Sequence, residues 1–255
     1  MRTDIGKFGL FALALGLALG LVSQSVYAEN GTAAKKTVLP TEHLRSLHKQ
    51  MTAGRTLATR DLRALADASD GLAAFKYGKW LEEQGQPGLM PDATHYYAIA
   101  SYTDRDFAVR RLVALLNDPT LKLSTARKNE ALDAMVRQAK TGNADAALAL
   151  SNMYAAGIPF GKDPKAVRNW LEVAAKSGRG DAAVKLALVY LMPTDGTAPD
   201  EEGARRALDI ALKQPDPGTK SMAQTLLARL DLTAPRLKVA TLRPLPRPLR
   251  EGVTP

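Results

Sequence analysis

The chain has 255 residues and is basic, with 35 Lys plus Arg against 26 Asp plus Glu. It contains no cysteine, which excludes disulfides, thiolate metal sites and cysteine nucleophiles. The excess charge lies at the flanks, because residues 29–60 hold six bases and two acids and residues 232–255 hold five bases and one acid. Residues 61–231 hold 22 of each sign. This pattern favours an anionic membrane surface or an acidic partner over nucleic acid.

The first 28 residues have the pattern of an export signal. Arg2 and Lys7 precede an apolar run over residues 8–22, and residues 26–28 offer a cleavage site after Ala28. The run is shorter than the roughly 18–20 residues that a spanning helix needs, so cleavage is favoured over retention as an anchor. We expect a periplasmic protein of a Gram-negative bacterium, with no integral membrane span after cleavage. The missing cysteine also excludes a lipoprotein anchor.

Residues 29–60 indicate a basic leader followed by a short helix. Apolar residues at helical spacing follow Thr41, and Gly54 is expected to end this helix. Thr59 is expected to cap the next helix, which opens the longer array over residues 61–231.

Two stretches that lie 36 residues apart have nearly the same sequence. The first contains Ala139, Gly142, Ala146, Ala147, Leu150 and Tyr154, and the second contains Ala175, Gly178, Ala182, Ala183, Leu186 and Tyr190. A fixed period of this length indicates stacked helical repeats, because one helix pair cannot bury its own apolar face. Earlier and weaker copies follow the same register. The sequence predicts an all-α solenoid with helix pairs at 61–101, 102–140, 141–177 and 178–214, and a closing helix at 218–231.

Each type of side chain that recurs between the repeat copies has a physical role. Paired alanines let two helices approach closely, and large aromatic side chains fill the wider spaces. Glycines at helix ends are expected to adopt positive φ. Asp163 and Asp200 are expected to cap helix N-termini, the first of them directly before a proline.

The repeat resembles the Sel-one-like repeat, a tetratricopeptide-like α/α repeat of about 36 to 40 residues. The resemblance is carried by Ala139, Gly142, Ala146, Ala147, Leu150, Tyr154, Gly157, Asp163, Ala166, Trp170, Ala174, Ala175 and Gly178. It implies a right-handed superhelix that makes protein–protein contacts. Exported bacterial members include periplasmic regulators and assembly factors for exopolysaccharides. The third copy departs from the pattern, with Pro193 at a glycine position and Ala207 at the tryptophan position.

The sequence offers no residues for catalysis. His43 and His48 lack the i, i+4 spacing of a helical metal site, and His95 has no partner histidine nearby. No nucleophile lies beside an identifiable base, and no nucleotide-binding loop is present. We therefore expect a protein that is not an enzyme and needs no cofactor or metal.

Aromatic residues cluster between positions 77 and 107. They are expected to form core between helices, or, as the alternative, to expose a platform for a sugar ring or a partner side chain. The candidate binding residues in this cluster are Trp80, Tyr96 and Tyr97.

The tail over residues 232–255 is rich in proline and is expected to be extended or disordered. Pro244, Pro246 and Arg247 are candidates for docking into an aromatic groove, with a solvated tail as the alternative. Together these features predict an exported protein-binding repeat protein that regulates or scaffolds an envelope system such as exopolysaccharide production. Its partner would be a membrane sensor or a polysaccharide-assembly component. A carbohydrate- or peptidoglycan-binding module is the alternative function.

Overall fold

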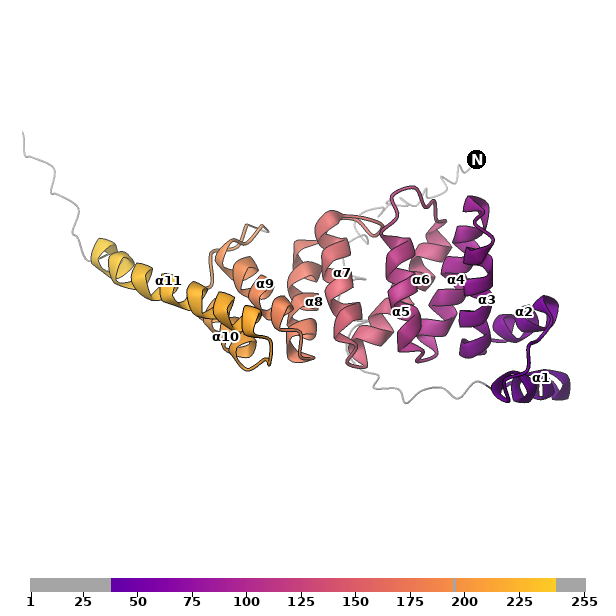
Figure 1. The fold of residues 1–255 in the computed structure, drawn as a ribbon. Helices are drawn as coiled ribbons and strands as arrows, with labels where there is room; N and C mark the ends of the chain where they lie inside the picture. The colour runs from indigo at the N-terminus through magenta and orange to yellow at the C-terminus, as the bar shows by residue number, and fades with distance from the viewer. Residues whose placement is uncertain (1–37, 195, 242–255) are drawn as a thin grey trace, which may run out of the picture. The chain divides into compact units, whose positions relative to one another are not determined.

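The computed structural model describes residues 38–194 and 196–241, and every regular element within them is helical (Figure 1). The signal segment, most of the leader and residues 242–255 lie outside the described residues, and with them Pro244, Pro246 and Arg247. Among the described helices, none combines the length and apolar character that crossing a bilayer requires.

The helices follow one another along the chain as a stack of pairs (Figure 1). Three pairs are packed tightly, α3 with α4, α7 with α8 and α9 with α10, and each neighbours the next element of the stack. The all-α class and the α/α solenoid predicted from the repeat are confirmed. The elements are α1 (Glu42–Thr52), α2 (Thr59–Asp67), α3 (Gly71–Glu83), the 3-10 turn η1 (Pro87–Leu89), α4 (Met90–Tyr102), α5 (Asp106–Leu116), α6 (Thr125–Lys140), α7 (Ala144–Ala156), α8 (Pro164–Lys176), α9 (Gly180–Leu191), α10 (Glu201–Leu212) and α11 (Pro217–Thr241).

The tight pairs depend on small residues at their contact faces. A methyl side chain lets two helix backbones approach closely, and packing at this distance is dense enough to exclude water. The alanines of the repeat lie at these contacts and are 0–1 % exposed, namely Ala73, Ala74, Ala146, Ala147, Ala174, Ala175, Ala182 and Ala183. Tyr154 and Trp170 lie at the edge of the core and are only partly buried.

The expected helix boundaries are formed by the expected groups. Asp163 accepts hydrogen bonds from the backbone N–H groups of Lys165 and Ala166, both at 3.0 Å. Asp200 accepts one from Gly203 N at 2.7 Å. Gly157 ends α7 with φ of 81°, a left-handed conformation that glycine adopts without steric cost.

The cap predicted at Thr59 is wrong by one residue. The helix starts after Ala58, whose carbonyl oxygen accepts from the N–H groups of Asp61 and Leu62, and no side chain caps it. Asp61 in the first turn provides a negative charge near the helix N-terminus instead, which the helix dipole favours.

The weakest repeat copy contains its two helices, α5 and α6, but not the expected tight pair. α6 packs mainly against α4 and α7 and meets α5 at few positions. The buried face of α5 carries Val109, Leu112 and Leu116 in place of an alanine pair, and such large side chains hold helices further apart. α6 therefore lies beside α4, and this arrangement creates the site described below.

The closing helix is longer than expected. α11 runs to Thr241, ten residues past the expected end at position 231 and into the segment assigned to the tail. Pro235 lies inside the helix and removes one hydrogen-bond donor. Most of the residues around it are good helix formers, and the helix continues on both sides.

Candidate functional site

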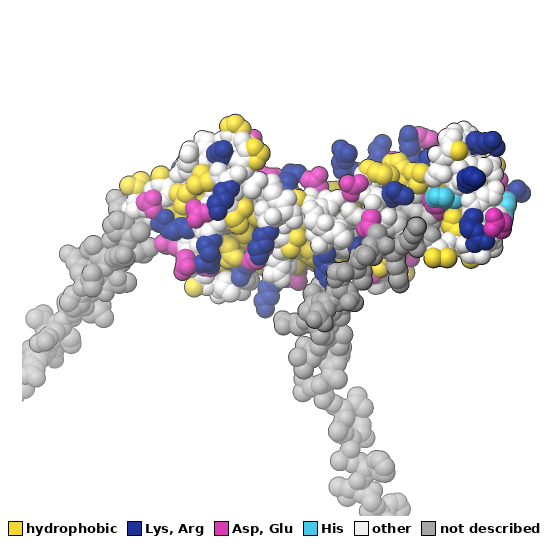
Figure 2. Space-filling view, turned by 90° about the horizontal axis from the view of Figure 1, so that it is seen from below, with side chains coloured by type: hydrophobic (Ala, Val, Ile, Leu, Met, Phe, Trp, Pro, Cys, Tyr) yellow, Lys and Arg dark blue, Asp and Glu magenta, His cyan; other side chains and the backbone are white. Residues whose placement is uncertain are grey.

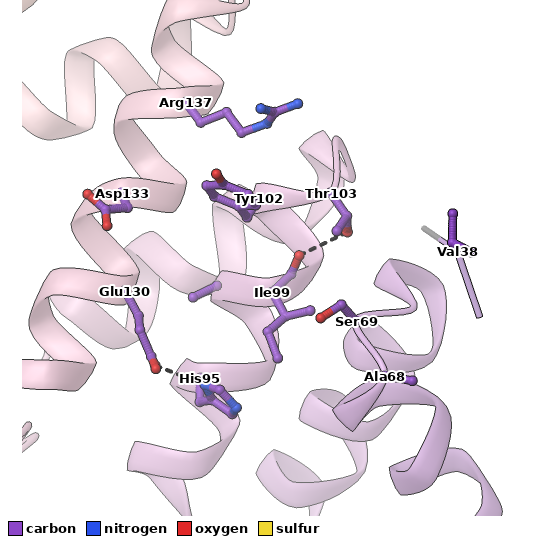
Figure 3. A pocket seen from close by; sticks show the side chains of 11 residues that line it. Val38, Ala68, Ser69, His95, Ile99, Tyr102, Thr103, Glu130, Asp133 and Arg137 are labelled. Carbon is purple, nitrogen blue, oxygen red and sulfur yellow. Dashed lines mark hydrogen bonds and ion pairs between the residues drawn. The ribbon is translucent and has the colours of Figure 1, made fainter. Parts of the chain in front are cut away.

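A groove of about 730 Å³ lies between α2, α4 and α6, and we call it the α2–α4–α6 groove (Figure 3). Its floor comes from α4, one wall from α6, and the other wall from the end of α2 and the turn that follows. The lining residues are Val38, Ala68, Ser69, His95, Ala98, Ile99, Tyr102, Thr103, Glu130, Asp133 and Arg137.

The depth of the groove follows from the residues of α4. Ala98 is 3 % exposed and contributes only a methyl group to the floor. Ile99 and Tyr102 flank it with larger apolar side chains, and Tyr102 is half exposed. Thr103 closes this end of α4 by donating its hydroxyl to the carbonyl oxygen of Ile99 at 2.9 Å. The floor of the groove is therefore apolar and open to an occupant.

One end of the groove is a cluster of three polar side chains from α4 and α6. Glu130 pairs with His95 Nδ1 and with Arg127 Nη1, each at 2.9 Å. The carboxylate can only accept, so Nδ1 of His95 carries a proton. Partial burial alone would raise the pKa of Glu130, but hydrogen bonds and charge from Arg127 and His95 outweigh it and lower that pKa. The charge of Glu130 is therefore already matched.

The other end of the groove is formed by Tyr102 and Arg137. The Arg137 guanidinium lies 5.0 Å from the centre of the Tyr102 ring, within the range of a cation–π contact. Its Nη2 atom pairs with Asp104 at 3.3 Å. These contacts hold Tyr102 in place with one face covered, and they match the charge of Arg137.

Asp133 lies between these two ends on the α6 wall (Figure 3). Its side chain is exposed, and within residues 38–194 and 196–241 it has neither an ion pair nor a side-chain hydrogen bond. Asp133 therefore offers a ligand a carboxylate beside an apolar floor.

A second hollow of about 460 Å³, the Trp80 hollow, adjoins the groove and shares His95 with it. Trp80 is 36 % exposed and stacks on Tyr77, with ring centres 5.5 Å apart and planes inclined by 13°. The lining residues are Arg63, Asp67, Tyr77, Trp80, Leu81, Leu89, Asp92, His95, Tyr96 and Arg127. Acids, bases and an aromatic surface meet in this hollow.

Tyr96 and Tyr97 are buried, at 5 % and 0 % exposure, so neither offers an open ring face to a ligand. Tyr96 donates its hydroxyl to Asp67 at 2.6 Å, and Tyr97 donates to Glu82 at 2.7 Å. Burial first, and then these carboxylates, raise the pKa of both phenols. The core interpretation holds for them, because α3, α5 and α6 all pack around α4. Of the three aromatic candidates, Trp80 alone is exposed.

The residues that line the groove were not singled out as a site from the sequence. Glu130, Asp133 and Arg137 are spaced three and four residues apart, which places them on one face of a helix. This spacing was a usable signal for a stripe of charges. The sequence did not show that the stripe faces α4.

Charge over the array is mixed, as the balanced composition of residues 61–231 predicts. Figure 2 shows Lys and Arg interspersed with Asp and Glu, with hydrophobic side chains gathered in separate patches between them. Among the residues that the structure describes, no three His, Asp or Glu side chains are grouped so as to hold a metal ion.

Comparisons with known proteins return fold neighbours alone. No family model matches the chain, and no curated protein matches it. A Sel1 repeat protein from Oxalobacter formigenes is 20 % identical with a TM-score of 0.38, over 68 % of this chain and 71 % of that one. The antigen c5321 of uropathogenic Escherichia coli, described as having an SLR fold, is 16 % identical with a TM-score of 0.41. That match covers 83 % of this chain and half of the antigen.

Proposed function

We propose that this chain is an exported periplasmic protein that binds other proteins and thereby regulates or scaffolds an envelope system. Exopolysaccharide production is the leading candidate for that system, and a membrane sensor or a polysaccharide-assembly component is the leading candidate for the partner. The proposed role is binding without catalysis.

The α2–α4–α6 groove is the observation that carries the proposal. It combines an apolar floor, a half-exposed Tyr102 and charged walls. Protein interfaces commonly have this composition, with an aromatic anchor at the centre and polar groups at the rim. A segment of a partner seated on Ile99 and Tyr102 would remove apolar surface from water while the charges of the walls set its register.

The sequence at the two ends of the chain supports the proposed location. Residues 1–28 have the composition of an export signal, and both basic flanks would favour an anionic membrane surface or an acidic partner. Basic flanks of this kind speed the encounter with such a partner, in a manner that weakens with salt.

Site-specific photocrosslinking tests the protein-binding role directly. A photoreactive residue in place of Tyr102 is expected to trap a specific envelope protein in living cells. The same residue in place of Asp209, an exposed position on α10, is the control and should not trap it. Equal trapping from both positions, or none from Tyr102, would remove the groove as the binding site.

Deletion of the gene tests the process. We expect a change in secreted or surface polysaccharide, and complementation by the wild-type chain should restore it. Polysaccharide, motility and biofilm that all remain unchanged would exclude the envelope system named here, whatever the crosslinking result.

Carbohydrate or peptidoglycan binding is a second candidate, favoured by the Trp80 hollow. An exposed indole ring offers an apolar face for a sugar, and Arg63, Asp92 and Arg127 surround it with hydrogen-bonding groups. Glycan-array and peptidoglycan pull-down signals should disappear in Trp80→Ala with helicity retained. An array without any signal for the wild-type chain argues against this role.

A further inference from the structure

We propose that the α2–α4–α6 groove recognises a short extended segment of a partner protein in which a Lys or Arg stands beside an apolar residue. This inference rests on the proposed function and specifies the chemistry of the partner. It follows from three properties of the groove, namely its unmatched charge, its apolar floor and its length.

The charges of the groove leave one negative group unmatched in the described part of the chain. Glu130 is matched by Arg127 and His95, and Arg137 is matched by Asp104. Asp133, on the same face of α6, has no such partner within the described ranges. A cationic side chain of an occupant would form an ion pair with Asp133, whereas an acidic side chain would be repelled by it.

The floor favours an apolar side chain next to that cation. Ala98 leaves room above α4, and Ile99 and the open face of Tyr102 provide apolar surface on either side of that space. The Arg137 guanidinium covers the other face of the Tyr102 ring and holds it in place. An apolar side chain inserted here displaces water from three hydrophobic groups at once.

The length of the groove fixes the size of the segment. His95 and Tyr102 mark its two ends on α4, and the seven helical steps between them span about 10 Å at the rise of an α-helix. An extended chain advances by roughly 3.3 Å per residue, so about three residues lie within the groove. A central Lys or Arg with an apolar neighbour on either side fits this span.

Fluorescence anisotropy with two labelled peptides tests the inference on the full chain. One peptide has a Leu-Lys-Leu centre and the other a Leu-Glu-Leu centre, each flanked by serines. The wild-type chain should bind the lysine peptide at least about tenfold more tightly. Asp133→Lys should reverse the preference, and the matched charge change Asp209→Lys on α10 should leave it unaltered.

The remaining outcomes distinguish failure of the groove chemistry from failure of the proposed function. Equal binding of both peptides, or equal effects of Asp133→Lys and Asp209→Lys, overturns the groove chemistry even if crosslinking at Tyr102 has already recovered a protein. Loss of self-association in Asp133→Lys, measured by sedimentation, would make a second copy of the chain the occupant and also overturn the inference. Peptide selectivity without any crosslinked protein would instead leave the chemistry intact and remove the proposed function.

Discussion

Replacing Asp70 by Ala should destabilise the fold more than loss of any other single helix cap in the stack. Asp70 caps α3 by accepting from Ala73 N at 2.9 Å, and the Nδ1 atom of His48 on α1 donates to the same carboxylate. Asp70 is only 4 % exposed, so water cannot take over these contacts. A lost cap costs about 1 kcal/mol, and a lost hydrogen bond to a charged group costs about 1.5–3 kcal/mol when it is well shielded.

His48 is 39 % exposed, which reduces the second contribution, and we expect a total of about 2–3 kcal/mol. For a chain of this size that lowers the melting temperature by about 4–12 °C. Asp163→Ala is the matched control, because Asp163 also caps a helix but lies at an exposed position without a histidine partner. Circular dichroism at 222 nm would follow both melts. A loss in Asp70→Ala no greater than in Asp163→Ala would refute the reasoning.

Two further predictions concern backbone conformation and pH. Gly157→Ala should lower the free energy of unfolding in urea by about 1 kcal/mol or more, because φ is 81° and the added Cβ would lie 2.8 Å from a lysine side chain. Gly85→Ala, also at positive φ but in open space, should lower it by less. Burial and then the carboxylate of Glu172 raise the pKa of Tyr190 to about 12. Because the pKa of Tyr190 is higher in the folded chain than in the unfolded one, the protonated phenol stabilises the fold. This contribution is fully present below pH 10 and is lost as pH rises towards 12. Tyr190→Phe should reduce the fall in the free energy of unfolding between pH 10 and pH 12. An unchanged slope over this range would contradict the role given to Tyr190.

The positions of most helices were predictable because their signals are local. Ser124 caps α6, and both α5 and α6 lie within the helix pair expected at 102–140, although their repeat copy is the weakest. Caps, glycines and the spacing of apolar residues act over a few residues, so they can be found without knowledge of the fold. The prediction for α11 ended at residue 231, because the proline-rich composition of residues 232–255 was given more weight than the helix formers at the start of that segment.

The groove was not predictable from these signals, because it joins residues far apart in the chain. His95 and Glu130 are 35 residues apart, and their contact depends on α6 lying against α4. The same arrangement buries Tyr96 and Tyr97 while Tyr102, one to two turns further along α4, stays half exposed. A list of aromatic residues cannot separate these cases.

Sequence alone determined the repeat period, the helical class and the residues that begin or end several helices, since each depends on chemistry within one or two turns. Tertiary structure decided which helices lie side by side, which aromatic rings are buried and which carboxylate is left without a partner. These outcomes depend on the volume of side chains that meet across helices, as when the large residues of α5 leave α4 as the main neighbour of α6.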